Sequence, residues 1–438
     1  MKKSFVFLLL ALAVVVLISP GIVGRLAEEA MDEALDRAAT QSQEFRVTSS
    51  HFKRSWFSSE GQHRVEIRDT ELRDSLLALA QVNGLAELPA LIIDTHIDHG
   101  IIPVTSVGRE KGSLAPGLGS AVSSLSLEFD SGSTIELPAT VYSEVGIMGQ
   151  LASNLVMGPG SFNVESETAE WGDVDVAVTV SPMSSLVGFA GAISHLSLLS
   201  PYSELTFSNI EFSGEQEQTR FGFAVGDFEL AVETIAYPSN LGPAESGPWR
   251  IRSSADLDDD LVSGQTQIDT DYLAIEGLGP TAIGIDAALT DVDAASISRI
   301  SRTIDQFDSY GSRDDLMIAV SPDLETLFAT GFELDVERLD LTSPTGTIAA
   351  KIDVDVAPTD VDRFEMTSSL LAAYARLDLE LSEQMFDYLA AINPEAATAA
   401  AMGFLRRNGN VYEMVALLEN GKLTVNGAPM PLPLQSGN

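Results

Sequence analysis

Residues 174–180 read Val174-Asp175-Val176-Ala177-Val178-Thr179-Val180, with an apolar side chain at every second position. Successive side chains of a β-strand point to opposite faces, so this alternation predicts a strand with one apolar and one solvated face. The same period recurs along most of the chain, for example at Leu125–Phe129, Phe221–Val225, Phe332–Val336 and Ile352–Val356. Repeated half-apolar strands of this kind are typical of antiparallel sheets.

We therefore expect a mainly β protein with a few helices, an α+β fold built from long antiparallel meander sheets. Helices are predicted at Leu72–Gln81, at Leu289–Phe307 after a cap at Asp291 or Asp293, at Ser382–Ile392, and from Asn393-Pro394 to Arg406-Arg407. The dipeptide Asn426-Gly427 predicts a tight turn between two short strands.

The N-terminus carries a different signal. Lys2 and Lys3 precede an unbroken apolar run at Phe5–Ile18, and no charge follows until Arg25. An uncharged span of about 20 residues is long enough to cross a bilayer, and the leading lysines place the N-terminus in the cytoplasm. A cleaved signal peptide is the alternative, although Ser19-Pro20-Gly21 is a poor cleavage site. The expected anchor residues are Phe5, Leu8, Leu12, Val15 and Ile18.

The predicted organisation has four parts. Residues 1–24 form the cytoplasmic tip and anchor, and 25–43 form an amphipathic juxtamembrane helix. Residues 44–245 and 246–438 form two β-rich halves, divided at the Pro- and Gly-containing stretch Tyr237–Pro248. This predicts a single-pass protein of a bacterial inner membrane, with the bulk of the chain in the periplasm.

Charge and cysteine content exclude several functions. The chain has 25 basic and 64 acidic residues, a formal net charge of −39, and no cysteine. Such a surface repels phosphate backbones, so nucleic acid is not an expected partner. The absence of cysteine excludes disulfides, thiol nucleophiles, Cys-ligated metals and a lipoprotein anchor. The acidic surface is also typical of exported proteins adapted to salt.

One cluster has residues that bind divalent metals. Asp94, His96 and Asp98 alternate in a predicted strand, so the three side chains share a face. The alternative is a row of solvated strand positions. Asp256, Asp258 and Asp260 have the spacing of a calcium loop, but Leu261 replaces the required Gly. No catalytic motif or cofactor fingerprint is present, so no cofactor is expected.

A second candidate is the segment that carries Lys53, Arg54, Trp56 and Phe57. Aromatic side chains beside a local basic pair are suited to a membrane interface or an anionic glycan. The alternative is an aromatic pair in the first turn of the core, with Lys53 and Arg54 bound to neighbouring carboxylates.

Several of these segments together resemble the YdgA-like proteins, a bacterial family of unassigned function. The resemblance rests on the N-terminal anchor, on Phe52–Glu60, on Ile285–Ala294 and Glu337–Gly346, and on the closing Gly421–Leu432. It implies an envelope location and a β-rich domain outside the cytoplasm. It implies no catalytic residues.

Three functional hypotheses remain open. The first is a non-enzymatic envelope protein, either a structural module or one that handles lipid or another apolar ligand on its sheet. The second is a metal-assisted hydrolase that uses the Asp94–His99 cluster. The third is a self-associating homo-oligomeric scaffold, because the alanine-rich helix 26–39 follows a membrane helix.

The net charge predicts the response to salt. A folded domain that carries most of a charge of −39 brings its carboxylates closer together than the unfolded chain does. Salt shortens the screening length from about 30 Å at about 0.01 M to about 3 Å at about 1 M. The melting temperature of a fragment spanning residues 26–438 should therefore rise with NaCl at neutral pH. A flat or falling melting temperature would show that the charges are dispersed or paired.

Overall fold

The structure of the protein is a computed structural model. It describes residues 45–54, 58–67, 89–99, 117–129, 132–146, 148–164, 167–181, 186–200, 203–239, 242–275, 277–306, 313–358 and 373–431. The described residues form mainly antiparallel β-sheet with four helices, which confirms the predicted fold class. The predicted transmembrane segment, the juxtamembrane helix and the helix at Leu72–Gln81 lie outside these residues. None of the described helices is long and apolar enough to span a membrane.

The chain divides into two compact units. The first comprises the residues up to Glu215 together with Ala236–Pro238, and the second comprises Gln216–Ile235 and the residues from Ser239 onward. The boundary therefore falls within a strand pair upstream of the predicted seam at residue 245.

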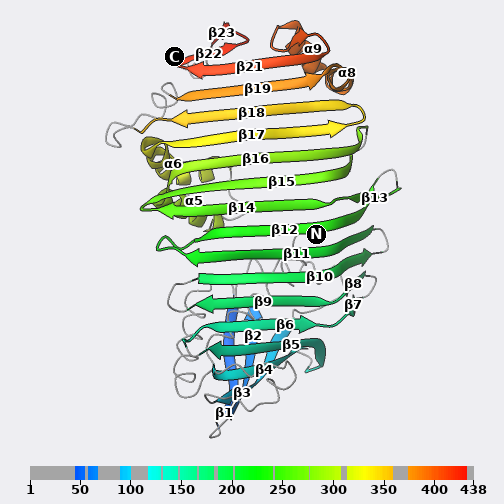
Figure 1. The fold of residues 1–438 in the computed structure, drawn as a ribbon, viewed down its shortest axis with the longest axis vertical. Coiled ribbons are helices and arrows are strands. Elements are labelled where there is room, and N and C mark those ends of the chain that lie inside the picture. Colours follow the sequence, from blue (N-terminus) through cyan, green and yellow to red (C-terminus); the bar gives the residue numbers. More distant parts are fainter. Residues whose placement is uncertain are drawn as a thin grey trace. The chain divides into compact units, whose positions relative to one another are not determined.

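The first unit is an antiparallel sheet in which β1 to β6 pair in chain order, followed by β9 and β10, with β8 on the second half of β10 and β7 on β8. Strand direction turns steadily from β9 to β2 (Figure 1). The strands are β1 (Phe45–Arg54), β2 (Ser58–Ile67), β3 (Ala90–His99), β4 (Gly117–Glu128), β5 (Thr134–Gly146), β6 (Leu151–Met157), β7 (Gly160–Val164), β8 (Glu167–Trp171), β9 (Val174–Ser181), β10 (Leu186–Ser200) and β11 (Ser203–Gln218).

One face of this sheet is the core of the unit. Val174, Val176 and Val178 are all buried, as the alternation of that segment predicts. Some side chains on this face carry hydroxyl groups, and these hydroxyl groups pair with one another across strands. Thr95 Oγ1 lies 2.8 Å from Ser123 Oγ, and Ser143 Oγ lies 2.9 Å from Ser153 Oγ.

His63 is the exception to this pairing. His63 lies on β2 and is only 1% exposed. The Nδ1 atom of its ring has no hydrogen-bond partner among the described residues. Burial lowers the pKa of the imidazole from the ordinary value, and the charge of Asp94 acts in the opposite direction. The ring is therefore held neutral within the core.

The second unit is a single long antiparallel sheet in the order β12, β14, β15, β16, β17, β18, β19, β21, β22, β23, with β13 also on β15 and β20 on β21. The strands are β12 (Ala224–Ser239), β13 (Gly242–Ser246), β14 (Trp249–Asp258), β15 (Leu261–Ile275), β16 (Gly279–Asp293), β17 (Phe332–Ser343), β18 (Gly346–Val356), β19 (Tyr374–Ser382), β20 (Arg406–Asn408), β21 (Val411–Glu419), β22 (Lys422–Val425) and β23 (Ala428–Met430). Asn426 and Gly427 have φ of 50° and 77°, which confirms the predicted tight turn between the last two strands.

Four helices lie at the ends of these strands: α5 (Ala294–Gln306), α6 (Arg313–Thr330), α8 (Glu383–Ile392) and α9 (Pro394–Ala401). The prediction for α8 is confirmed, and Asn393 caps α9 by accepting a hydrogen bond from Glu395 N. The predicted end of that second helix at Arg406-Arg407 is wrong, because these residues pair with β21 as β20.

The predicted start at Leu289 is also wrong. Residues 289–293 complete β16, and α5 begins only at Ala294, where Asp293 Oδ1 accepts a hydrogen bond from Ser296 N. Their apolar spacing suits a helix face, but pairing with β15 and β17 binds their backbone groups in the sheet. The sequence analysis missed α6, whose apolar residues form no clear stripe and which contains Pro322.

A β-bulge in β17 places an arginine between two carboxylates. Register shifts at Val336/Leu339 leave Glu337 and Arg338 together against Lys351 of β18. The Arg338 guanidinium lies 2.8 Å from Asp286 and 2.6 Å from Asp269, and these hydrogen bonds raise its pKa, the bond to Asp286 most. The guanidinium lies over Gly284, where a Cβ would come within 2.4 Å of Nη1.

His63 should make stability depend on pH. Its folded pKa lies below the ordinary 6.5, so below that pH the unfolded chain binds a proton that the folded protein excludes. The contribution of the neutral His63 ring to the free energy of unfolding is complete above pH 6.5. It is lost as pH falls below that value, by at most about 1.4 kcal/mol per pH unit. Urea unfolding at about pH 7.5 and about pH 5.5 should show a larger loss for the native protein than for His63→Gln. Equal losses would contradict a buried neutral ring.

Arg338 should contribute more to stability than a singly paired surface arginine. Arg338→Met leaves Asp269 and Asp286 without their shared counter-charge, so we expect the free energy of unfolding to fall by about 1–2 kcal/mol. Arg252 pairs only with Glu229 and is more exposed, so Arg252→Met should cost about 0.5 kcal/mol or less. Urea unfolding of both variants at low salt is the measurement, and equal losses would exclude the doubly paired arrangement.

Candidate functional site

The second unit has an apolar face that runs across eight strands. Its central row, which we call the middle row, consists of side chains that lie opposite one another from strand to strand. The middle row is Leu230, Ile251, Ile268, Ile285, Leu339, Ala350, Leu379 and Met414. Seven strand spacings of about 4.8 Å make this row about 34 Å long.

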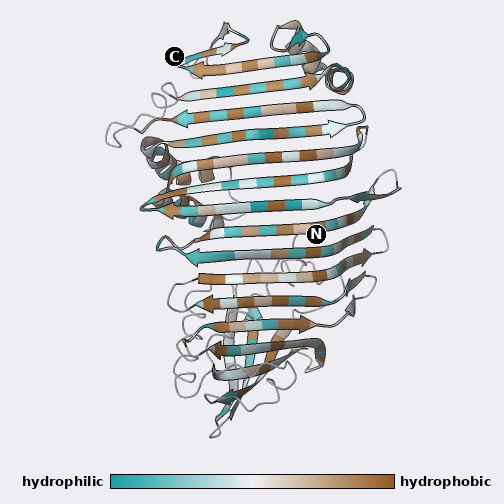
Figure 2. Ribbon diagram, in the orientation of Figure 1, coloured by the Kyte–Doolittle hydropathy of each residue, from teal (hydrophilic) through white to brown (hydrophobic). Residues whose placement is uncertain are grey.

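Further rows run parallel to it on the same face. Ile283, Leu341, Ile348, Leu381 and Tyr412 form one row, and Ala287, Val336, Ile352, Leu377 and Ala416 form part of another. The alternation of apolar and polar residues that produces these rows is visible along the strands (Figure 2). We call the surface made by the middle row and these two rows the apolar face.

Helices cover the two margins of the apolar face. On the α8 side the cover reaches the middle row, because Leu379 and Met414 pack against the cluster of Leu381, Phe386 and Leu405. At one margin the ring of Phe328 in α6 lies 5.4 Å from that of Phe332 in β17. At the other, the ring of Phe386 in α8 stacks 3.8 Å from that of Tyr412 in β21. The helix pairs lie at opposite ends of the strands (Figure 1). Between them Leu339 is 40% exposed.

The opposite face of the same sheet is acidic. Asp335, Asp353 and Asp355 are exposed there, together with Asp256, Glu333 and Glu380. Arg376 binds Asp378 at 2.7 Å, and this hydrogen bond lowers the pKa of the carboxyl group. The acidic face remains hydrated, so the two faces of one sheet offer opposite environments.

The predicted metal-binding residues lie in a row on the solvated face of β3. His96 Nε2 lies 3.5 Å from Asp98 Oδ1, and His96 Nδ1 lies 3.9 Å from Glu60. Asp94 accepts a hydrogen bond of 2.8 Å from Gln62. No three His, Asp or Glu side chains within the described ranges gather closely enough to hold a metal ion. Metal binding by Asp94, His96 and Asp98 stays a prediction.

The other predicted sites fall into three groups. Lys53 is exposed on β1 opposite Glu60, Arg54 pairs with Ser59 through the backbone, and Trp56 and Phe57 lie outside the described residues. The anchor residues from Phe5 to Ile18 also lie outside them. Of the aspartates with calcium-loop spacing, Asp256 and Asp258 lie on β14 and Asp260 lies in the turn to β15. Arg220 binds Asp260 and donates to the Asp259 carbonyl in that turn.

The apolar face itself was not located by the sequence analysis. Each strand showed the alternation, but the register that aligns Ile285 with Leu339 depends on the bulge in β17. Aligning the apolar positions of successive strands, with one residue allowed for each bulge, is the signal that could have located it.

The comparisons with known proteins identify a family and no function. No curated protein and no solved structure matches the chain. A family model described as a bacterial protein of unknown function (DUF945) matches residues 1–433, in agreement with the YdgA-like resemblance. The chain therefore belongs to this family of bacterial proteins of unknown function.

Proposed function

We propose that the protein is a non-enzymatic lipid-handling protein of the cell envelope, which holds acyl chains against the apolar face of its second unit. The middle row of apolar side chains, open at Leu339, is the observation that supports the proposal. In this proposal the segment Phe5–Ile18 anchors the protein in the inner membrane, and the two units lie in the periplasm.

The size of the face favours a long apolar ligand. A continuous exposed apolar patch on a soluble protein is seldom larger than about 300–600 Å² and commonly marks a binding surface. The middle row is about 34 Å long, whereas the acyl layer of one bilayer leaflet is about 15 Å thick. In this proposal an extended acyl chain lies along the part of the row from Leu230 to Leu339.

Transfer from water to this face is favourable for a chain of methylene groups. Each buried CH₂ contributes about 0.8 kcal/mol, so ten contribute about 8 kcal/mol before the cost of ordering the chain. Among the described residues the acidic face has no apolar row of this kind, so we expect the ligand on one side of the sheet only. Leu339 is the exposed apolar position where such a chain gains the most contact.

The test is the lipid content of the purified full-length protein. We expect phospholipid or fatty acid to copurify and to be released by solvent extraction. Leu339→Asp places a carboxylate in the middle row and should reduce the bound lipid at least about twofold. The matched control is Ala349→Asp, which adds the same charge on the exposed, opposite face of β18.

Mass spectrometry of extracted lipid distinguishes the outcomes. Loss of lipid from Leu339→Asp, with the native amount kept by Ala349→Asp, supports the proposal. Native protein without lipid, or equal amounts in both variants, would contradict it.

A further inference from the structure

The helical hairpin α5–α6 has an apolar end that faces solvent. Its large side chains there are unusually exposed: Ile304 at 52%, Met317 at 50% and Ile318 at 71%. Exposed side chains of this size are ordinary when scattered singly, but these three lie in one hairpin.

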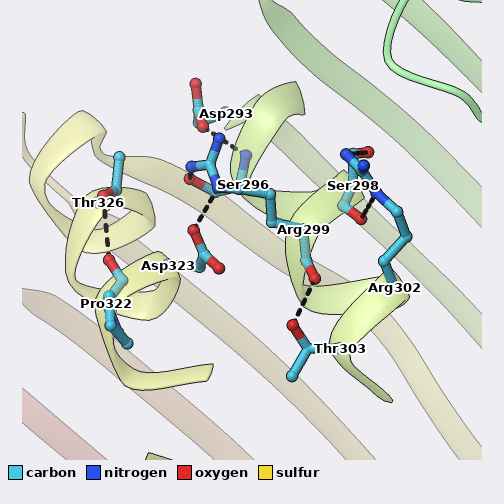
Figure 3. A network of polar contacts seen from close by, with 9 residues as sticks. All are labelled: Asp293, Ser296, Ser298, Arg299, Arg302, Thr303, Pro322, Asp323 and Thr326. Atoms are coloured by element: carbon cyan, nitrogen blue, oxygen red, sulfur yellow. Dashed lines mark hydrogen bonds and ion pairs between the residues drawn. The ribbon is translucent and has the colours of Figure 1, made fainter. Parts of the chain in front are cut away.

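An ion pair between the two helices places these residues at the same end of the hairpin. Arg299 of α5 binds Asp323 of α6 at 2.5 Å, which fixes the antiparallel register of the two helices (Figure 3). Five residues further along α5, and five residues back along α6, lie Ile304 and Ile318. Because both helices rise about 1.5 Å per residue, these two side chains lie at the same level. We call Ile304, Met317 and Ile318 the apolar tip.

The other end of the hairpin is fixed to the sheet. Ser298 Oγ donates a hydrogen bond of 2.6 Å to the Phe221 carbonyl, and Ala294 N donates to the Asp260 carbonyl at 2.9 Å. Phe328 contacts Phe332 at the margin of the apolar face. The hairpin thus connects a solvent-exposed apolar tip with the surface proposed to hold acyl chains.

A cation suited to a lipid phosphate lies behind the apolar tip, toward the end of α5 that is fixed to the sheet. Arg302 donates to the Ser298 carbonyl at 3.2 Å and to its hydroxyl at 2.8 Å (Figure 3). It pairs with no carboxylate in the described part of the chain, although acidic residues outnumber basic ones 64 to 25. The Arg302 side chain turns back to Ser298, so its guanidinium lies about 9 Å behind Ile304 along α5. At that level it can bind a head-group phosphate while Ile304 enters the acyl layer.

From this geometry we propose that the apolar tip of α5–α6 inserts into the surface of a phospholipid bilayer, with Arg302 at the phosphate level, where lipid passes between the bilayer and the apolar face. The inference rests on the proposed function, since it names the source of the acyl chains. The predicted anchor supports a bilayer as the partner.

The chain's lack of cysteine allows one label to be placed at a time. The full-length protein is reconstituted in phosphatidylcholine vesicles with an environment-sensitive fluorophore on Ile318→Cys. Lipids brominated on their acyl chains are then used as quenchers. We expect quenching at position 318 to exceed that of the matched control, Met402→Cys in the turn after α9, at least about threefold. Met402 is equally apolar and is 63% exposed.

Quenching at position 318 no greater than at position 402 would overturn the inference. A third label, on Leu339→Cys, separates this failure from that of the proposed function. Quenching at 339 without quenching at 318 would support acyl chains on the apolar face and contradict insertion of the apolar tip. Quenching at 318 without quenching at 339 would support insertion of the apolar tip and contradict lipid binding on the apolar face.

The arginine has its own test in the same vesicles. Arg302→Gln combined with Ile318→Cys should reduce quenching at least about twofold, because the head-group contact is lost. Arg252→Gln combined with Ile318→Cys is the control, since Arg252 lies on β14 and pairs with Glu229. Equal quenching in both combinations would overturn the assignment of Arg302 to the phosphate.

Discussion

Backbone hydrogen bonds between antiparallel strands set the chemistry of the second unit. They hold each strand at a fixed register to its neighbours, so an apolar residue on β14 meets an apolar residue on β15 and β16. Because side chains alternate between faces, one register produces both an apolar row and an acidic row. A slip of one residue in any strand would place its aspartates among the isoleucines of the middle row.

The bulge in β17 keeps the apolar face continuous at a point where the sequence breaks the alternation of apolar and polar residues. Glu337 and Arg338 are consecutive charged residues, and without an extra residue Leu339 would point to the acidic face. The bulge returns Leu339 to the middle row, and Asp269 and Asp286 hold Arg338 on the other side. Charge pairing on the acidic face and continuity of the apolar face therefore depend on the same local irregularity.

A single sheet with one apolar side needs a cover, and the described helices supply it at the margins and over Leu379 and Met414. Phe328 and Phe386 each bring an aromatic ring from a helix onto the end of the strands. The exposed Leu339 in an otherwise apolar row is the physical reason to assign the apolar face to a ligand. The hairpin α5–α6 has the same property on a smaller scale, with Ile318 more exposed than any residue of the middle row.

The amino-acid sequence alone determined the fold class, the solvated face of each strand, the helix start at Pro394 and the turn at Asn426-Gly427, because these depend on local periodicity and on residues with strong backbone preferences. It could not determine that residues 289–293 extend a strand, or that Arg406 and Arg407 pair with β21, because partners distant in sequence decided both. It also gave no sign that His63 is buried, since burial depends on which residues cover a strand. The alignment of eight strands into one apolar face, open at Leu339, arose only in the tertiary structure, because register and bulges are properties of strand pairs and not of any one segment.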